Sequence, residues 1–281
     1  MLGNKEKIIG YQGTLGSFSE EALVKYFGDE YNKKNYMEFE DVFKALKDRE
    51  VDYGILPIEN TTTGSITKVY DLLREYGFFI VGETLIKIEH NLLGFKDAKI
   101  DQLKEIYSHS QGFEQSSKFL SSLKSDIKLI PYHNTAVSVE YVSESFDKTK
   151  AAIGSKRAGD IYGLEVLKEA INNYKKNYTR FIVIGRQFES SEECDKISIS
   201  FSLGNIPGDL YRELKAFHDN NINMIKIESR PIGDGSFNYY FYIDIDGNVK
   251  SENIRETLKI VSNNTKEYKL LGGYRRWREL T

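Results

Sequence analysis

The sequence has little cysteine and little histidine, and it lacks long apolar runs. One of its 281 residues is cysteine, Cys194, and four are histidine. An intramolecular disulfide is therefore excluded and few side chains remain to bind a metal ion, so we expect no metal and a reducing, cytoplasmic compartment. No segment approaches the roughly 18–20 apolar residues of a membrane-spanning helix, and residues 1–7 are not followed by the apolar stretch of a signal peptide. The sequence thus predicts neither a membrane protein nor an exported one.

Neither sign of charge is in clear excess. Lys and Arg together number 39 against 42 for Asp and Glu, which gives a net charge of −3. Nucleic acids and anionic membranes bind strongly basic surfaces, so neither is an expected partner. An anionic ligand would have to be bound by local groups. The fractions of hydrophobic residues, 40%, and of aromatic residues, 13%, are those of a folded chain with a sizeable core.

Short apolar runs alternate with amphipathic stretches through residues 1–187, which is typical of α/β proteins with a largely parallel sheet. Such folds bind ligands at the carboxyl ends of their strands, so we expect the site in those loops. Strands are expected at residues 7–11, 36–39, 53–56 (stopped by Pro57), 105–109, 128–130, 151–154 and 180–184. Helices are expected to begin at Ser17 or Ser19, at Asp41, after Ser65, at Gln111, at Asn134 or Thr135, and at Ser155.

A polar, acidic stretch at residues 188–195 interrupts this periodicity and is predicted to be a linker. Beyond it, residues 196–281 show the order strand, helix, strand, strand, helix, strand. That order is the βαββαβ arrangement of ferredoxin-like domains. The sequence therefore predicts two α/β domains of different size.

A glycine-rich turn, Gly10-Tyr-Gln-Gly13-Thr-Leu-Gly16, connects the first predicted strand to a helix that begins at Ser17 or Ser19. The free N–H groups at the start of a helix bind anions. Dinucleotide-binding folds use the spacing G-x-G-x-x-G, whereas the spacing here is G-x-x-G-x-x-G. We therefore interpret the turn as a carboxylate site and not as a nicotinamide site.

A second polar segment follows the strand at residues 53–56. Asn60 and Thr61 offer hydrogen-bond donors for an oxyanion, and Glu59 is a candidate acid, base or orienting group. The alternative interpretation is the capped start of a helix, with no role in binding. The local pattern does not choose between the two.

Two more candidates lie at strand ends. Ser108 beside His109 raises the hypothesis of a hydrolase, but neighbours in a strand face opposite ways and the nucleophile elbow G-x-S-x-G is missing. Arg180 has a planar guanidinium suited to a carboxylate, and a solvated charge at a sheet edge is the alternative. We therefore do not predict a Ser-His hydrolase.

Taken together, six segments resemble the prephenate dehydratase family in order along the chain. They are GYQGTLGSFSEEA, GILPIENTTTGSI, VGETLIKIEHNLLG, SHSQGFEQSSKFL, AAIGSKRAGDIYGLEVL and NYTRFIVIG. After them, NIPGDLYREL and INMIKIESRP resemble the motifs of a regulatory ACT domain. The resemblance implies a two-lobed catalytic domain like a type 2 periplasmic binding protein at residues 1–187, and an ACT domain at residues 196–281.

The resemblance also implies a reaction: prephenate loses carbon dioxide and its ring hydroxyl to give phenylpyruvate, without a cofactor. Thr179 is then expected to donate a hydrogen bond to the departing hydroxyl. A guanidinium on the leaving carboxylate would raise the barrier, so Arg180 is expected on the pyruvyl carboxylate. The other catalytic residues are expected to be Glu59, Asn60, Ser108 and Gln111. The other substrate-binding residues are expected to be Ser17, Ser19, Thr61, Gly64 and Ser65.

The ACT resemblance implies feedback by L-phenylalanine bound between two such domains, and hence a homodimer or a tetramer. The implied effector residues are Asn205, Gly208, Asp209, Leu210, Glu228 and Ser229. Asp209 departs from the small residue usual in the family, and its carboxylate would repel that of the effector unless it faces solvent. Arogenate dehydratase, or a sensor that binds an amino acid without catalysis, are the alternative functions.

Overall fold

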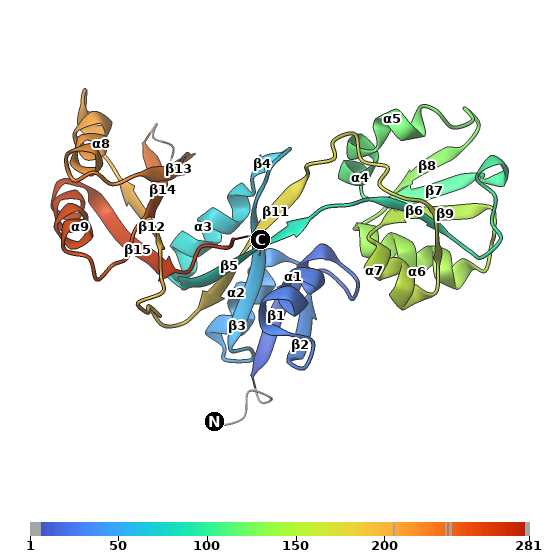
Figure 1. Cartoon of the computed structure of the whole chain (residues 1–281), viewed down its shortest axis with the longest axis horizontal. Helices are drawn as coiled ribbons and strands as arrows, with labels where there is room; N and C mark the ends of the chain where they lie inside the picture. The colour runs from blue at the N-terminus through green and yellow to red at the C-terminus, as the bar shows by residue number, and fades with distance from the viewer. Residues whose placement is uncertain (1–6, 205, 234, 236–237, 279–281) are drawn as a thin grey trace. The chain divides into compact units, whose positions relative to one another are not determined.

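The computed structural model describes residues 7–278 except 205, 234, 236 and 237. Strands and helices alternate along most of this length (Figure 1). The chain forms two compact units that are not contiguous in sequence. The residues up to Ile66 form the first unit together with Thr84–Phe181, while Thr67–Glu83 and the residues from Ile182 onward form the second. The main chain therefore crosses between the units at residues 66–67, 83–84 and 181–182.

The first sheet has the strand order β2-β1-β3-β11-β5, with β4 paired to the end of β3. Its strands are β1 (Ile8–Gln12), β2 (Asn32–Tyr36), β3 (Tyr53–Asn60), β4 (Gly64–Ser65), β5 (Phe79–Lys87) and β11 (Tyr178–Gly185). β1 runs parallel to both β2 and β3. Helices α1 (Phe18–Phe27) and α2 (Phe39–Lys47) contact β1 and β3. The unit boundaries fall within β5 and β11, so these two strands contribute residues to both units.

Both ends of α1 follow from the sequence. Ser17 precedes the helix in an extended conformation, and its Oγ accepts a hydrogen bond from the backbone N–H of Glu20 at 3.3 Å. Gly28 ends the helix with a φ of 101°, a conformation that glycine adopts without steric cost. Ala22 and Leu23 are fully buried against the sheet. The helix predicted to begin at Ser17 or Ser19 is confirmed, with Ser17 as its N-cap.

Two expected elements of the first sheet lie elsewhere. The second strand is β2, Asn32–Tyr36, and not residues 36–39; its sequence NKKNY has no apolar run because it is an edge strand. Phe39 instead begins α2, with Glu38 at the N-cap and not Asp41. Pro57 does not stop β3: the pairing of β3 with β1 spans residues 53–55, so the missing N–H of Pro57 removes no bond from that ladder.

The second sheet, also in the first unit, has the order β10-β6-β9-β7-β8. Its strands are β6 (Asn91–Gly94), β7 (Glu105–Ser108), β8 (Lys128–Pro131), β9 (Lys150–Gly154) and β10 (Glu165–Lys168). β7 runs parallel to β8 and β9, whereas β6 pairs antiparallel with β9 and β10. The connecting helices are α4 (Ser110–Gln115), α5 (Ser117–Leu120), α6 (Thr135–Ser145) and α7 (Lys156–Tyr162). The helix expected from Gln111 is thus broken at Ser116 into two short ones.

Both faces of the second sheet are covered, because successive apolar residues point to opposite sides. Leu93, Tyr107 and Ala152 pack with Val139 and Val142 of α6. Their chain neighbours on the other face are in a second cluster with apolar residues of α4 and α5; that cluster includes Leu92, Ile106, Ala151 and Ile153. A sheet buried on both faces is typical of α/β proteins, and the expectation of an α/β fold is confirmed.

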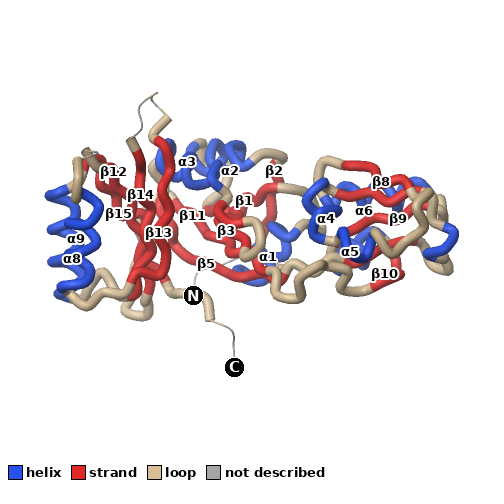
Figure 2. Tube along the Cα trace, turned by 90° about the horizontal axis from the view of Figure 1, so that it is seen from above, coloured by secondary structure: helices blue, strands red, loops and turns tan. Residues whose placement is uncertain are grey.

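The second unit contains a four-stranded antiparallel sheet of order β13-β14-β12-β15. Its elements are β12 (Lys196–Ser202), α8 (Asp209–Asp219), β13 (Met224–Pro231), β14 (Tyr239–Asp246), α9 (Glu252–Asn264) and β15 (Lys266–Tyr274). Residues Ile197, Ile199 and Phe201 of β12 lie in one apolar cluster with Phe217 of α8 and Val261 of α9. The order of elements confirms the βαββαβ prediction, and Figure 2 shows the two helices along one side of this sheet.

Helix α3 (Thr67–Tyr76) also belongs to the second unit, although it precedes the C-terminal sheet by more than 100 residues. The hydroxyl of Tyr242 donates to the backbone carbonyl of Tyr70 at 3.0 Å. The guanidinium of Arg74 lies 4.7 Å from the ring centre of Tyr240, and Asp71 accepts from Arg230 at 2.9 Å. These contacts join Thr67–Glu83 to the C-terminal sheet in one compact unit.

Candidate active site

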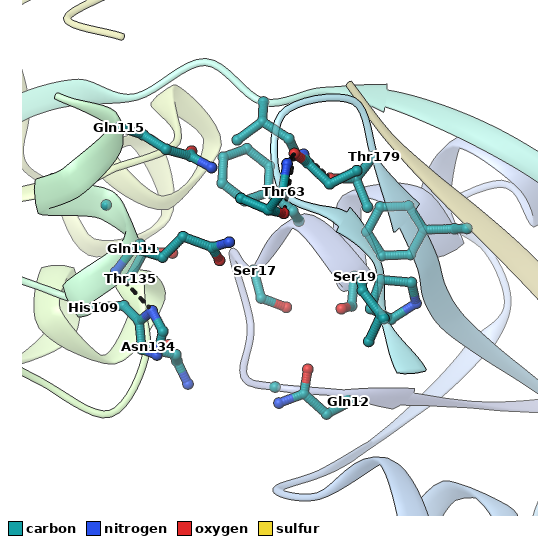
Figure 3. A pocket seen from close by; sticks show the side chains of 18 of the residues that line it. Gln12, Ser17, Ser19, Thr63, His109, Gln111, Gln115, Asn134, Thr135 and Thr179 are labelled. Carbon is teal, nitrogen blue, oxygen red and sulfur yellow. Dashed lines mark hydrogen bonds between the residues drawn. The ribbon is translucent and has the colours of Figure 1, made fainter. Parts of the chain in front are cut away.

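The first unit contains a pocket of about 360 Å³. This volume is within the range of about 300–1,000 Å³ typical of small-molecule sites. The pocket is lined at the carboxyl ends of β1, β3, β7 and β8, by the loops and helix starts that follow them, and by the start of β11. The labelled side chains of Figure 3 accordingly belong to strand ends, loops and helices beside both sheets of the unit. The expectation of a site at strand ends agrees with this placement.

Helices α1 and α6 are among those of the first unit that begin at the pocket. Ser17 caps α1, and the Oδ1 of Asn134 caps α6 by accepting from the backbone N–H of Val137 at 2.8 Å. Ser17, Asn134 and Thr135 all line the pocket. Because the first turn of a helix carries free N–H groups and the positive end of its dipole, each start provides a position for an anion.

None of the described residues that line the pocket has a carboxylate, an amine or a guanidinium. The polar side chains are amides, hydroxyls and the imidazoles of His90, His109 and His133. The apolar ones include Phe39, Pro57 and Phe181. Such a lining suits a small molecule with an apolar ring and with anionic groups bound by neutral donors.

A hydrogen-bond network fixes the hydroxyl of Thr179. The Oδ1 of Asn60 accepts from the backbone N–H groups of Thr62 at 2.8 Å and Thr63 at 3.0 Å. Since a backbone N–H can only donate, the Nδ2 of Asn60 must be on the other side, where it donates to Thr179 Oγ1 at 2.9 Å and to Asn177 Oδ1 at 2.8 Å. Thr179 Oγ1 therefore accepts this bond, and its own O–H proton is left for another acceptor.

The structure brings five of the expected site residues to the pocket: Asn60, Gln111 and Thr179 of the expected catalytic set, and Ser17 and Ser19 of the expected binding set. Others lie nearby without lining it. Ser108 is fully buried and donates to the carbonyl of Ile153 at 3.4 Å. The Oγ1 of Thr61 accepts from the backbone N–H of Tyr178 at 2.9 Å. Gly64 and Ser65 form β4 opposite the end of β3.

Arg180 and Glu59 are placed together, away from the pocket lining. Their side chains pair at 3.3 Å, and Arg180 is only 13% exposed. Thr179 and Phe181 line the pocket. Because side chains alternate along a strand, Arg180 between them points to the opposite face of β11.

The sequence interpretation missed Gln115, Asn177 and His90. Gln115 and His90 line the pocket, and Asn177 bonds both Gln115 and Asn60. A signal for two of them was present: Gln115 is four residues after Gln111, on the same helical face, and Asn177 is two residues before Thr179, on the same face of an extended chain. Burial lowers the pKa of His90 and outweighs the opposite effect of its hydrogen bond to Gln115.

The start of α1 is tied to α7 of the second sheet. Glu20 is completely buried in its side chain and accepts from Arg157 Nε at 2.7 Å and Arg157 Nη2 at 2.8 Å, and also from Lys33 at 3.2 Å. A Cβ added at Gly16 would lie 3.0 Å from the Cα of Ala158, so the two segments approach as closely as only glycine permits. These contacts hold the helix start at the pocket in place.

The expected effector residues lie around α8 and on β13 of the second unit. Gly208 is the N-cap of α8 with a φ of 87°, and Leu210 follows in its first turn. Asp209 accepts from the backbone N–H of Ile206 at 3.2 Å and pairs with Arg212. Glu228 and Ser229 lie on β13. Asn205 lies outside the described residues.

No three His, Cys, Asp or Glu side chains among the described residues are grouped as metal ligands would be. No helix in that part of the chain is long and apolar enough to cross a membrane.

Comparisons with known proteins agree along nearly the whole chain. Residues 9–189 match the prephenate dehydratase family. A bifunctional chorismate mutase/prephenate dehydratase of Enterobacter agglomerans is 34% identical over 271 residues, which is 95% of this chain and 70% of that protein. The structure of a prephenate dehydratase of Arthrobacter aurescens in complex with L-Phe has a TM-score of 0.87 and 25% identity, over 96% of this chain and 90% of that one. GqqA, a quorum-quenching acylase, has a TM-score of 0.87 and 26% identity, over 96% and 98% of the two chains.

Proposed function

Because this chain belongs to the prephenate dehydratase family, we propose that the pocket of the first unit is where prephenate is converted to phenylpyruvate. The reaction removes carbon dioxide from one ring carbon and the hydroxyl from the opposite one. Electrons released by decarboxylation pass through the ring and expel the hydroxyl as the ring becomes aromatic. The protein must therefore orient a dianion and assist a departing hydroxyl.

The arrangement of donors in the pocket supports one orientation of the substrate. In Figure 3, Thr179 and the start of α6, with Asn134 and Thr135, lie on opposite sides of the pocket. The hydroxyl and the carboxylates of prephenate are likewise at opposite ends of its ring. We assign the hydroxyl to Thr179, whose proton is free to be donated, and the pyruvyl carboxylate to the free N–H groups at the start of α6.

The absence of amines and guanidinium groups among the described lining residues fits the decarboxylation step. A carboxylate that leaves as carbon dioxide loses its charge, so a strong ion pair would stabilise the ground state and raise the barrier. Amide and hydroxyl donors bind the dianion without this penalty. The pairing of Arg180 with Glu59 does not support the expected role of Arg180, and we assign the pyruvyl carboxylate without it.

The same lining favours prephenate over arogenate, which carries an ammonium group in place of the keto group. No described lining residue offers a carboxylate to that ammonium. Leaving a charged group unpaired in a pocket costs about 1–3 kcal/mol or more. We therefore expect kcat/KM for prephenate to exceed that for arogenate by about 10–100-fold, as measured by the absorbance of phenylpyruvate and by the amino acid product, each in an acid-free workup.

Prephenate aromatises in acid without an enzyme, so a protein-free sample is the control for this measurement. Equal kcat/KM values for the two substrates would contradict the assignment of specificity. No turnover of either substrate would contradict the assignment of the pocket.

We also assign L-phenylalanine as an effector of the second unit, in a homodimer or a tetramer. The support is the βαββαβ sheet and the likeness to a prephenate dehydratase that was crystallised with L-Phe. The charge of Asp209, which would repel the carboxylate of the effector, is compensated by Arg212. Asp209 is therefore compatible with effector binding.

Titrating L-phenylalanine into the assay is expected to lower the rate with prephenate by at least about fivefold at saturation, which corresponds to a coupling energy of about 1 kcal/mol. D-Phenylalanine is the matched control, because it has the same charge and apolar area. A flat titration curve with the L-isomer would contradict the assignment of the effector, while leaving the assignment of the pocket intact.

A further inference from the structure

His90 lies outside all the strands and helices of the first unit, between β5 and β6, and is held on several sides. Its backbone N–H donates to Asn172 Oδ1 at 2.6 Å, and its carbonyl accepts from Ile171 at 2.9 Å. Its ring forms a T-shaped pair with that of Phe18, with the ring centres 5.8 Å apart. The residue is only 3% exposed. The position of the imidazole is therefore determined independently of the network that it joins.

The amide network beside Thr179 closes into a ring with one consistent direction. Asn60 Nδ2 donates to Asn177 Oδ1 at 2.8 Å, and Asn177 Nδ2 donates to Gln115 Oε1 at 3.0 Å. Gln115 Nε2 donates to Thr62 Oγ1 at 3.4 Å, and Thr62 Oγ1 donates back to Asn60 Oδ1 at 2.6 Å. Hydrogen bonds that point one way around a ring polarise and strengthen one another.

This direction determines the tautomer of His90. Its Nε2 is 3.0 Å from Gln115 Oε1, which already accepts from Asn177. A carbonyl oxygen can only accept, so His90 must carry its proton on Nε2. Its Nδ1 is then a bare acceptor, buried and without a hydrogen-bond partner among the described residues. Protonation of Nδ1 would bury a donor without a partner, so the imidazole stays neutral.

His90 thereby opposes a reversal of the hydrogen-bond direction in the amide network. If the Gln115 amide turned over, its NH₂ group would face two donors, Asn177 Nδ2 and His90 Nε2. If the Asn177 amide turned over as well, its NH₂ would face Asn60 Nδ2, whose position the backbone N–H groups of Thr62 and Thr63 fix. His90 therefore holds the Gln115 end of the network in the direction that these backbone N–H groups impose at the Asn60 end, because its proton cannot leave Nε2 without placing a donor at Nδ1.

We propose that His90 is a positioning residue that holds the Gln115 end of the Asn60–Asn177–Gln115–Thr62 ring, and so supports the arrangement in which the hydroxyl proton of Thr179 is free for the departing hydroxyl of the substrate. The inference rests on the proposed function of the pocket. The side-chain hydrogen bond of His90 is to Gln115 and not to Thr179, so His90 acts on Thr179 through the network. Its contribution is therefore expected in kcat, and little of it in KM.

Two substitutions separate the effect of losing the Nε2–H donor from the effect of losing the imidazole itself. His90→Met keeps the size of the side chain but has no donor, and we expect kcat to fall by about 10–100-fold with KM within about threefold, as for loss of one buried hydrogen bond. His90→Gln places an amide NH₂ where Nε2 lies, and we expect it to restore kcat to at least about a third of the wild-type value. His218→Met, at an exposed position of α8, is the matched control.

The tautomer is tested without turnover. Long-range ¹H–¹⁵N correlation spectra of the wild-type protein are expected to show His90 neutral with its proton on Nε2. A proton on Nδ1, a normal kcat in His90→Met, or equal losses in folded His90→Met and His90→Gln would each overturn the proposal. If His90→Met does not fold, the spectrum of the wild type decides. Failure of the pocket assignment would appear separately, as full activity of a variant without the Thr179 hydroxyl.

Discussion

Replacing Thr179 by valine is expected to lower kcat for prephenate by about 10²–10³-fold, the loss typical of removing one donor to charge that develops in the transition state. Valine keeps the shape of the side chain and removes the hydroxyl. Thr179 accepts from Asn60 Nδ2 at 2.9 Å, so its own proton is the one directed elsewhere. KM should change much less than kcat, because the bond to the hydroxyl strengthens as the hydroxyl leaves.

Thr179→Ser retains the hydroxyl and is expected to keep most of the activity. Thr149→Val, which removes a hydroxyl that donates to Asp147 on a loop before β9, is the matched control for the chemical change. Circular dichroism spectra establish that each variant is folded. A Thr179→Val protein with wild-type kcat would refute the assignment of the departing hydroxyl to Thr179.

Removing the charge of Glu20 is expected to produce a large loss of stability. Breaking a buried ion pair by removing one partner costs about 3–5 kcal/mol, because the other charge is left uncompensated. Arg157 retains partial access to solvent, with 34% of its side chain exposed, so we expect Glu20→Gln to lower the free energy of unfolding by about 2–4 kcal/mol. Urea unfolding followed by circular dichroism measures this difference.

The pH dependence of the same variant tests the electrostatic origin of the loss. Burial alone would raise the pKa of Glu20, but the hydrogen bonds and charges of Arg157 and Lys33 outweigh it and hold the pKa below its ordinary value. A carboxyl with a lowered pKa stabilises the fold above its unfolded pKa of about 4.3 and loses that contribution as pH falls. The difference in the free energy of unfolding between the wild type and Glu20→Gln should therefore become smaller below about pH 4.3.

Asp29→Asn is the control, because Asp29 also pairs with Lys33 but is an exposed partner. Exposed ion pairs contribute little to stability, so this variant should unfold like the wild type. Equal losses in Glu20→Gln and Asp29→Asn would refute the special contribution of the buried pair.

The local signals of the sequence predicted elements better than sites. Ser17, Asn134 and Ser155 cap helices as expected, because a cap depends on a few adjacent residues. The edge strand β2 was misplaced because it has no buried face to produce a pattern. The strand β10 was not predicted either. It lies at an edge of the second sheet, and none of its four residues is fully buried.

The site depends on contacts between residues far apart in the chain. Asn60 and Thr179 were identified one at a time from motifs, but their hydrogen bond joins residues 119 positions apart. That bond could not be predicted from the sequence alone. The alternation of strand residues did contain one unused signal: if Thr179 faces the pocket, Arg180 cannot face it too.

The three crossings of the main chain between the two units have a consequence for the pocket. Ile66 and Phe181, the last residues of the first unit before two of these crossings, both line the pocket, and Phe181 is two residues from Thr179. No flexible spacer intervenes at Phe181, because the crossing falls inside the strand β11. Two of the three main-chain connections between the units therefore adjoin residues that shape the pocket.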